Sequence, residues 1–172
     1  ASINAKGGHF ELSFFITAQI IILLSFLLFN FPQAKIFFGD SGAYLMGSLI
    51  ALNIIMTNNL NQNISSFFFC ILLFYLFFEV FFSFFRKLIQ RKSPIYPDNR
   101  HLHMLSFYRI SKIYGNNKAN FLNSLVLNFV YFILIIPGLY FIEHPTLSRY
   151  WFFILLLIYT VGYSRLYYLT KN

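Results

Sequence analysis

The chain alternates between long apolar runs and short polar connections. Five runs are predicted to form membrane-crossing helices, at residues 12–30, 43–57, 64–85, 121–142 and 150–168. A transmembrane helix needs about 20 mostly apolar residues to cross a hydrocarbon core of about 30 Å, so the second run is short unless it begins within the interface. No run alternates with the period of two that a membrane β-barrel requires. The pattern predicts an all-α, polytopic membrane helix bundle with about five transmembrane helices.

One long polar loop, residues 86–118, separates the third and fourth runs. It contains eight of the thirteen Lys and Arg residues. With five spans, this loop lies on the same side as the loop after the first span and the last residues of the chain. That side carries eleven basic residues, and the other side carries only Lys6 and Arg149. Basic residues concentrate on the cytoplasmic side, so we expect a multi-pass membrane protein whose basic loop is cytoplasmic.

The composition agrees with this interpretation. Hydrophobic residues make up 58% of the chain and charged residues 10%, against about 25% charged in typical soluble domains. The net charge of +8 is explained by residues that flank spans, so it predicts membrane lipids and no nucleic acid as partners. The single cysteine, Cys70, excludes a disulfide framework. We expect residues 1–172 to form one membrane domain.

Asp40 is the first candidate for chemistry, because it lies between two glycines at the start of the second span. Gly39 and Gly42 permit tight turns and close approach of the backbone. Asp40 or Ser41 could simply cap the helix. Alternatively, a carboxylate at this point could hold Mg²⁺ through one oxygen, with waters and substrate phosphates as the other ligands. Both interpretations stay open at this point.

The second candidate is the pair His101 and His103 in the basic loop. Two histidines at i and i+2 point the same way only in extended backbone, and Pro97 favours a turn just before them. Two histidines without a third ligand make a weak metal site. Their basic neighbours make them better candidates for binding phosphate, and the alternative is a loop that lies on anionic headgroups. The polar loop residues singled out as substrate contacts are Arg91, Lys92, Ser93, Asp98 and Arg100.

Two polar side chains inside predicted spans complete the set of candidates. Glu79 is a carboxylate in the third span, where an ionisable group is costly and has a partner or a function. A hydrogen bond to Arg86 or to a neighbouring helix is as good an explanation as catalysis. Asn53, in the second span, is expected to make an interhelical hydrogen bond.

Several motifs together resemble the polyprenyl-phosphate N-acetylhexosamine-1-phosphate transferases, membrane enzymes of bacterial cell-wall and surface-polysaccharide synthesis. The similarity covers residues 30–117 and depends on the order and spacing of the motifs. It looks most like the branch with an acidic residue in the third span and a His-Leu-His motif, with Met104 where other branches have a further histidine. The motifs are Asn30-Phe31-Pro32, residues 35–44, Glu79, Arg86-Lys87, Ser93-Pro94, and residues 97–103.

This resemblance implies an enzyme that transfers a sugar-1-phosphate from a UDP-N-acetylhexosamine to undecaprenyl phosphate, giving a lipid-linked sugar diphosphate and UMP. It implies that Mg²⁺ is required and that Asp40 is a metal ligand. It places His101 and His103, with the basic residues around them, against the diphosphate of the nucleotide sugar. Phosphoryl transfer between two anions needs charge neutralisation and in-line positioning, which such a site provides.

The chain also departs from the family pattern. The Asp-rich motif and the Asn/Asp-Gly motif of the family's first half do not occur, and residue 1 is not Met. We therefore expect the chain to be roughly the C-terminal half of a larger transferase, inactive by itself. The rival hypothesis is a non-catalytic scaffold or pseudoenzyme that binds anionic lipid through the basic loop. A homodimer, the identity of the UDP-sugar and the polysaccharide pathway stay open.

Overall fold

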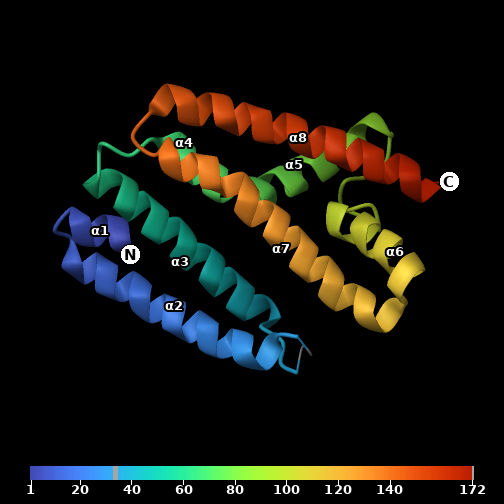
Figure 1. Cartoon of the computed structure of the whole chain (residues 1–172), viewed down its shortest axis with the longest axis horizontal. Helices are drawn as coiled ribbons and strands as arrows, with labels where there is room; N and C mark the ends of the chain where they lie inside the picture. Colours follow the sequence, from blue (N-terminus) through green and yellow to red (C-terminus); the bar gives the residue numbers. More distant parts are fainter. Residues whose placement is uncertain (33–34, 172) are drawn as a thin grey trace. The chain divides into compact units, whose positions relative to one another are not determined.

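The computed structural model describes residues 1–32 and 35–171, except for the side chain of Asn117. Within these ranges the chain forms eight helices and no strand (Figure 1). Four helices, α2, α3, α7 and α8, are long and apolar enough to cross a membrane, and the bent pair α4–α5 is a fifth if it forms one span. The prediction of an all-helical, polytopic membrane protein is therefore confirmed. The helices are α1 (Ser2–Lys6), α2 (Phe10–Asn30), α3 (Gly39–Leu60), α4 (Ser66–Leu72), α5 (Phe74–Ile89), α6 (Leu102–Tyr114), α7 (Asn116–Tyr140) and α8 (Pro145–Lys171).

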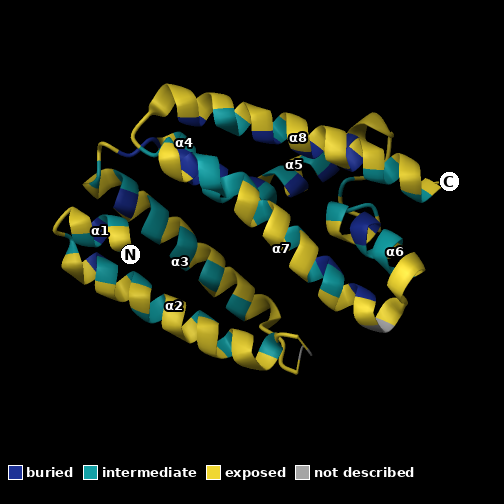
Figure 2. Cartoon of the chain, viewed as in Figure 1, coloured by how far each residue is buried: buried dark blue, intermediate teal, exposed yellow. Residues whose placement is uncertain are grey.

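The helices group into two compact units, residues 1–64 and the remainder from residue 65. Figure 2 shows exposed residues over much of the long helices. Many of these exposed residues are large and apolar, such as Phe14 at 78%, Leu28 at 80% and Phe132 at 64%. Such surface is unfavourable in water and is accounted for by contact with lipid. The prediction of one membrane domain stays a prediction.

The first unit consists of α1, α2 and α3. Helices α2 and α3 lie beside each other (Figure 1), and Asn53 of α3 donates to Gln19 Oε1 of α2 at 2.7 Å. The expected interhelical hydrogen bond is therefore confirmed. Helix α3 is longer at both ends than the predicted span of 43–57, so its 22 residues are sufficient to cross a bilayer.

The second unit, α4 to α8, has an aromatic core. Buried residues of α4, α5, α6 and α8 form it, and Tyr159 is at its centre. The ring of Tyr159 makes edge-to-face contacts with Phe74, Phe78 and Phe82 at centroid distances of 6.1, 5.0 and 5.3 Å. Such pairs contribute about 0.5–1.5 kcal/mol beyond the burial of their area. This packing fixes α8 against α5, which carries the acidic candidate residue.

The predicted third span is not one straight helix. The segment breaks between α4 and α5, and the two parts are bent by 73°. Leu73, at the break, has φ −110° and ψ 8°. A break frees carbonyl groups that lipid cannot satisfy, and the hydroxyl of Tyr131 in α7 donates to the carbonyl of Leu72. Neither Gly nor Pro marks this site, so the sequence contained no signal for the bend.

Candidate active site

The segment between α5 and α6 is held firmly by the end of α5. Arg86 Nη2 lies 3.0 Å from Asp98 Oδ2, and Asp98 Oδ1 accepts from the backbone N–H of Arg100 at 3.0 Å. Burial alone would raise the pKa of Asp98, but the N–H of Arg100 and the charge of Arg86 outweigh it, so the pKa lies below its ordinary value. Asp98 thus orders the turn that leads to the two histidines.

Two further side chains secure the same segment. Lys87, which is 7% exposed, donates to the carbonyls of Pro94 and Tyr96 at 3.2 and 2.6 Å. Tyr163 of α8 donates to the carbonyl of Arg100 at 2.9 Å. Since the backbone is tied to both α5 and α8, the predicted basic loop is an ordered platform, and its second half is the unpredicted helix α6.

Glu79 is the centre of the site in the second unit. Its Oε1 accepts from His101 Nδ1 at 3.0 Å and from the backbone N–H of Leu102 at 2.9 Å. The hydroxyl of Tyr159 donates to its Oε2. Glu79 is 9% exposed, and a buried carboxylate is stable only when hydrogen bonds replace its hydration. Of the two partners considered for Glu79, a neighbouring helix is confirmed through Tyr159 of α8, whereas Arg86 bonds instead to Asp98 and Ser83.

The two histidines lie beside each other, as the extended-backbone argument required. His101 has φ −72° and ψ 150° and is the N-cap of α6, while His103 is in its first turn. Their rings stack with centroids 5.7 Å apart and planes inclined by 15°. The carboxylate of Glu79 fixes the orientation of the first ring, and Asn123 of α7 donates to the carbonyl of His103 at 3.0 Å.

The remaining predicted substrate contacts differ in their surroundings. Arg91, Lys92 and Ser93 are exposed. Arg91 is in the left-handed region with φ 55°, and the N–H of Lys92 bonds to the carbonyl of Lys87 at 2.9 Å. This is a helix-ending turn in which Gly is the usual residue. Arg100 donates to Gln90 and lies over the ring of Tyr167. The structure does not test whether any of these residues binds substrate.

Asp40 lies in the first unit, in the first turn of α3. It is not the N-cap, because the helix begins at Gly39, where φ is +68°. Its side chain is exposed and has no hydrogen bond or ion pair among the described residues. Across the described parts of the chain, no group of three or more His, Cys, Asp or Glu side chains is placed to hold a metal. A site at Asp40 would depend on a single carboxylate.

Sequence reasoning missed two features of the second unit. Tyr159, the partner of Glu79 on α8, looked like one of many aromatic residues in the fifth run. Polar residues on α7 were also passed over, although Asn120, Ser124 and Asn128 recur every four residues in an apolar helix. That spacing places them on one face and was a signal that could have been used.

Comparison with known proteins finds similarity over parts of the chain. Residues 1–58 match the sequence model of glycosyl transferase family 4. The chain is 32% identical over 90 residues to the undecaprenyl-phosphate alpha-N-acetylglucosaminyl 1-phosphate transferase of Thermotoga maritima, an alignment that covers 52% of this chain and 30% of the relative. It is 42% identical over 52 residues to the phospho-N-acetylmuramoyl-pentapeptide-transferase of Shouchella clausii, covering 30% of this chain and 16% of that protein. No solved structure matches the chain.

These matches agree with the motif pattern of the sequence. They support the resemblance of this chain, an all-helical membrane protein, to glycosyl transferase family 4. The aligned stretches cover less than a third of either relative's length. The roles of the site residues in this chain therefore depend on the contacts described above.

Proposed function

We propose that the chain is part of an enzyme that transfers N-acetylhexosamine-1-phosphate from a UDP-sugar to undecaprenyl phosphate. An oxygen of the lipid phosphate attacks the phosphorus that carries the sugar. The bond from this phosphorus to the bridging oxygen of the diphosphate breaks, and UMP leaves with that oxygen. The product is a lipid-linked sugar diphosphate. The name of the Thermotoga maritima relative supports this reaction class.

The observation that carries the proposal is the hydrogen bond between Glu79 and His101. A carboxylate only accepts hydrogen bonds, so Nδ1 of His101 carries the proton and Nε2 is the ring nitrogen left for a substrate. The side chain of His101 is 31% exposed, so this nitrogen is within reach of a ligand. An oriented imidazole beside His103 offers Nε2 to a phosphate group, and Nε2 donates to a phosphate oxygen when both ring nitrogens carry a proton.

The exposed cations of the same platform complement that imidazole. Arg91 and Lys92 follow the end of α5 and face solvent. Phosphoryl transfer between two anions depends on positioning and on neutralising charge. A loop whose backbone is already fixed by Asp98 and Lys87 loses little conformational entropy when it binds a diphosphate.

In the first unit, Asp40 is the side chain that suits a divalent cation. It is an exposed carboxylate without a partner among the described residues, and Mg²⁺ is commonly held by one or two carboxylates with waters and substrate phosphates. The residue therefore fits Mg²⁺, which when bound would offset negative charge on the phosphoryl oxygens. We propose that Asp40 and His101 each take part in this reaction, on the cytoplasmic face of the bacterial inner membrane.

The test is a transferase assay with the protein as the cell encodes it. Membranes receive UDP-N-acetylglucosamine and undecaprenyl phosphate, and the lipid-linked product is measured. We expect Asp40→Asn and His101→Gln each to lower the rate by at least a hundredfold. Their matched controls, Glu143→Gln and His144→Gln, alter exposed residues of the turn before α8 and should leave it unchanged. Near-normal activity of Asp40→Asn would contradict the proposal.

A binding measurement with UDP-N-acetylglucosamine, with and without Mg²⁺, separates the enzyme from the scaffold hypothesis. A scaffold that binds lipid through the basic loop would show no Mg²⁺-dependent binding of UDP-N-acetylglucosamine. An enzyme would show such binding, and Asp40→Asn would weaken it. Binding that depends on Mg²⁺ but not on Asp40 would remove this residue from the site.

A further inference from the structure

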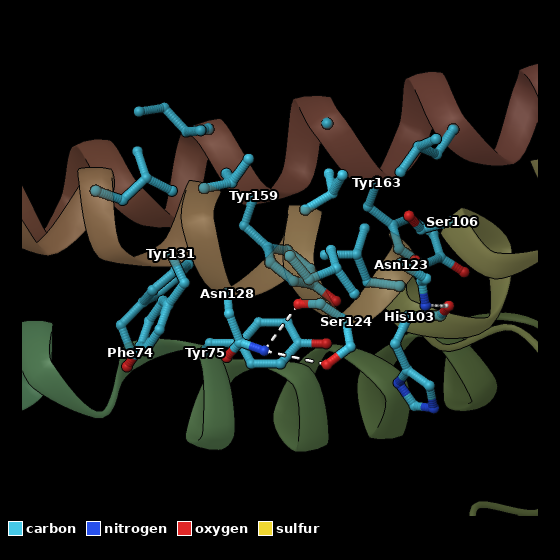
Figure 3. Close-up of a pocket in the computed structure, with 18 of the residues that line it drawn as sticks. Phe74, Tyr75, His103, Ser106, Asn123, Ser124, Asn128, Tyr131, Tyr159 and Tyr163 are labelled. Carbon is cyan, nitrogen blue, oxygen red and sulfur yellow. Dashed lines mark hydrogen bonds between the residues drawn. The ribbon is translucent and has the colours of Figure 1, made fainter. Parts of the chain in front are cut away.

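A cavity of about 620 Å³ lies among α5, α6, α7 and α8, away from the basic loop's exposed face. Figure 3 shows how its walls are divided: Phe74 and Tyr131 lie at one end, and His103, Ser106 and Asn123 lie at the other. Val130 and Ile158, which also line it, are 47% and 38% exposed, so the cavity is reached from the outside of the unit. We call it the apolar chamber.

A second cavity, of about 870 Å³, adjoins the first. His103, Asn120 and Asn123 line both cavities. The second is lined by the cations Arg100 and Lys171, by amide and hydroxyl groups, and also by the apolar side chains Met104, Leu105 and Phe107; no Asp or Glu is among its described lining residues. We call it the polar chamber. Its side chains suit an anion.

Helices α7 and α8 each line both chambers, and the two chambers follow each other in the same order along both helices. Along α8, Lys171 and Thr170 line the polar chamber near the helix end, while Gly162 and Ile158 line the apolar chamber further inward. Along α7, Asn116 lines the polar chamber, and the stretch 124–134 lines the apolar one. Ten residues of helix rise about 15 Å, which is half of a hydrocarbon core of about 30 Å. The depth of the apolar chamber along α7 therefore corresponds to the thickness of about one leaflet of the bilayer.

A buried polar atom marks the junction of the two chambers. Asn123 is 7% exposed, and its Oδ1 has no hydrogen-bond partner among the described residues although its Nδ2 is bonded to His103. An unsatisfied buried acceptor costs about 1–3 kcal/mol. A ligand that brings an O–H or N–H donor to this oxygen would therefore be stabilised at the junction.

We propose that the two chambers together bind one anionic bilayer phospholipid whose headgroup carries hydroxyl groups. The phosphate lies near Arg100 and Lys171, a headgroup hydroxyl donates to Asn123 Oδ1, and an acyl chain fills the apolar chamber. The chamber is one leaflet deep, which fits an acyl chain and is too short for a long polyprenyl chain. Bound there, the lipid would support the platform that carries His101. The proposal does not depend on transferase activity.

The test is native mass spectrometry of the purified chain released from detergent micelles. Dioleoyl phosphatidylglycerol is the probe, and dioleoyl phosphatidylcholine is the comparison lipid. We expect one phosphatidylglycerol to be retained per chain, at least tenfold more than phosphatidylcholine. Equal retention of the two lipids would overturn the anion selectivity. Preferential retention of added undecaprenyl phosphate would overturn the assignment to a bilayer phospholipid.

Variants locate the site. A side chain added at Gly162 meets nothing within 4 Å, so Gly162→Leu should fill the apolar chamber without a clash and lower retention at least fivefold. Gly47 of α3 also has open space around it, and Gly47→Leu is the matched control that should retain lipid normally. Lys171→Gln should lower retention severalfold, whereas Lys6→Gln should not. Unchanged retention in both Gly162→Leu and Lys171→Gln would refute the site.

Discussion

The substitution Glu79→Gln isolates the charge of the carboxylate from its shape. In the structure Glu79 accepts three hydrogen bonds, from His101 Nδ1, the N–H of Leu102 and the hydroxyl of Tyr159. The amide oxygen of Gln can still accept the first two, and Tyr159 can rotate its hydroxyl to accept from the amide. Hydrogen bonds to charged groups contribute about 1.5–3 kcal/mol and neutral ones about 0.5–1.5 kcal/mol. We expect a loss of about 2 kcal/mol in the free energy of unfolding.

Two measurements check this value and its cause. Thermal unfolding in detergent, followed by the fluorescence of Trp151, should show a fall of about 4–8 °C for a chain of this size. Carbethoxylation of His101, read by mass spectrometry with His144 as the internal reference, should become severalfold faster because a neutral amide holds Nδ1 less strongly than the carboxylate does. Glu143→Gln is the control for charge removal at an exposed site. A Glu79→Gln protein with wild-type stability and wild-type His101 reactivity would refute the role assigned to Glu79.

Three other predictions concern the surroundings of the site. Arg91→Gly should raise the free energy of unfolding by about 1 kcal/mol, because Gly adopts φ 55° without strain. The same substitution should weaken binding of UDP-N-acetylglucosamine, and tighter binding would remove Arg91 from the substrate contacts. The lowered pKa of Asp98 means that its contribution to stability is complete above its ordinary pKa and is lost as the pH falls through the lower value. Cleavage of the segment between α5 and α6 by pepsin should accelerate in that acidic range, and tryptic cleavage after Arg91 should accelerate in Asp98→Asn at neutral pH. Unchanged cleavage in both experiments, relative to a peptide of the same sequence, would contradict this. Gly138→Ala should lower the free energy of unfolding by about 1–3 kcal/mol, because the added Cβ would lie 2.9 Å from Ile71. Gly162→Ala, whose Cβ meets open space, should be neutral or stabilising by calorimetry. Equal effects of the two substitutions would contradict the packing of α4 against α7.

The spans and their approximate ends could be predicted because lipid imposes an apolar run of known length on each helix. The interhelical hydrogen bond of Asn53 followed from the same cause, since an amide inside a span needs a partner on another helix, but the sequence did not specify Gln19 as that partner. The bend at Leu73 could not be predicted, because it depends on packing and on the hydroxyl of Tyr131 rather than on Gly or Pro.

The candidate site was only partly visible for a related reason. The residue types of the basic loop and the closeness of His101 and His103 followed from motif and spacing. The partner of Glu79 did not, because Glu79 and Tyr159 are 80 residues apart and meet only through tertiary packing. The hydrogen bond of Asp98 with Arg86 likewise depends on how the loop returns to α5, which no local pattern specifies.

The most direct test of the proposed reaction follows the phosphate next to the sugar. UDP-N-acetylglucosamine labelled with ³²P at that phosphate is incubated with undecaprenyl phosphate, Mg²⁺ and membranes that contain the protein as the cell encodes it. Sugar-1-phosphate transfer predicts that the label moves into the lipid fraction and that unlabelled UMP is released in equal amount. We expect Asp40→Asn to abolish both. Labelled UDP in the aqueous phase, with sugar but no label in the lipid, would contradict sugar-1-phosphate transfer.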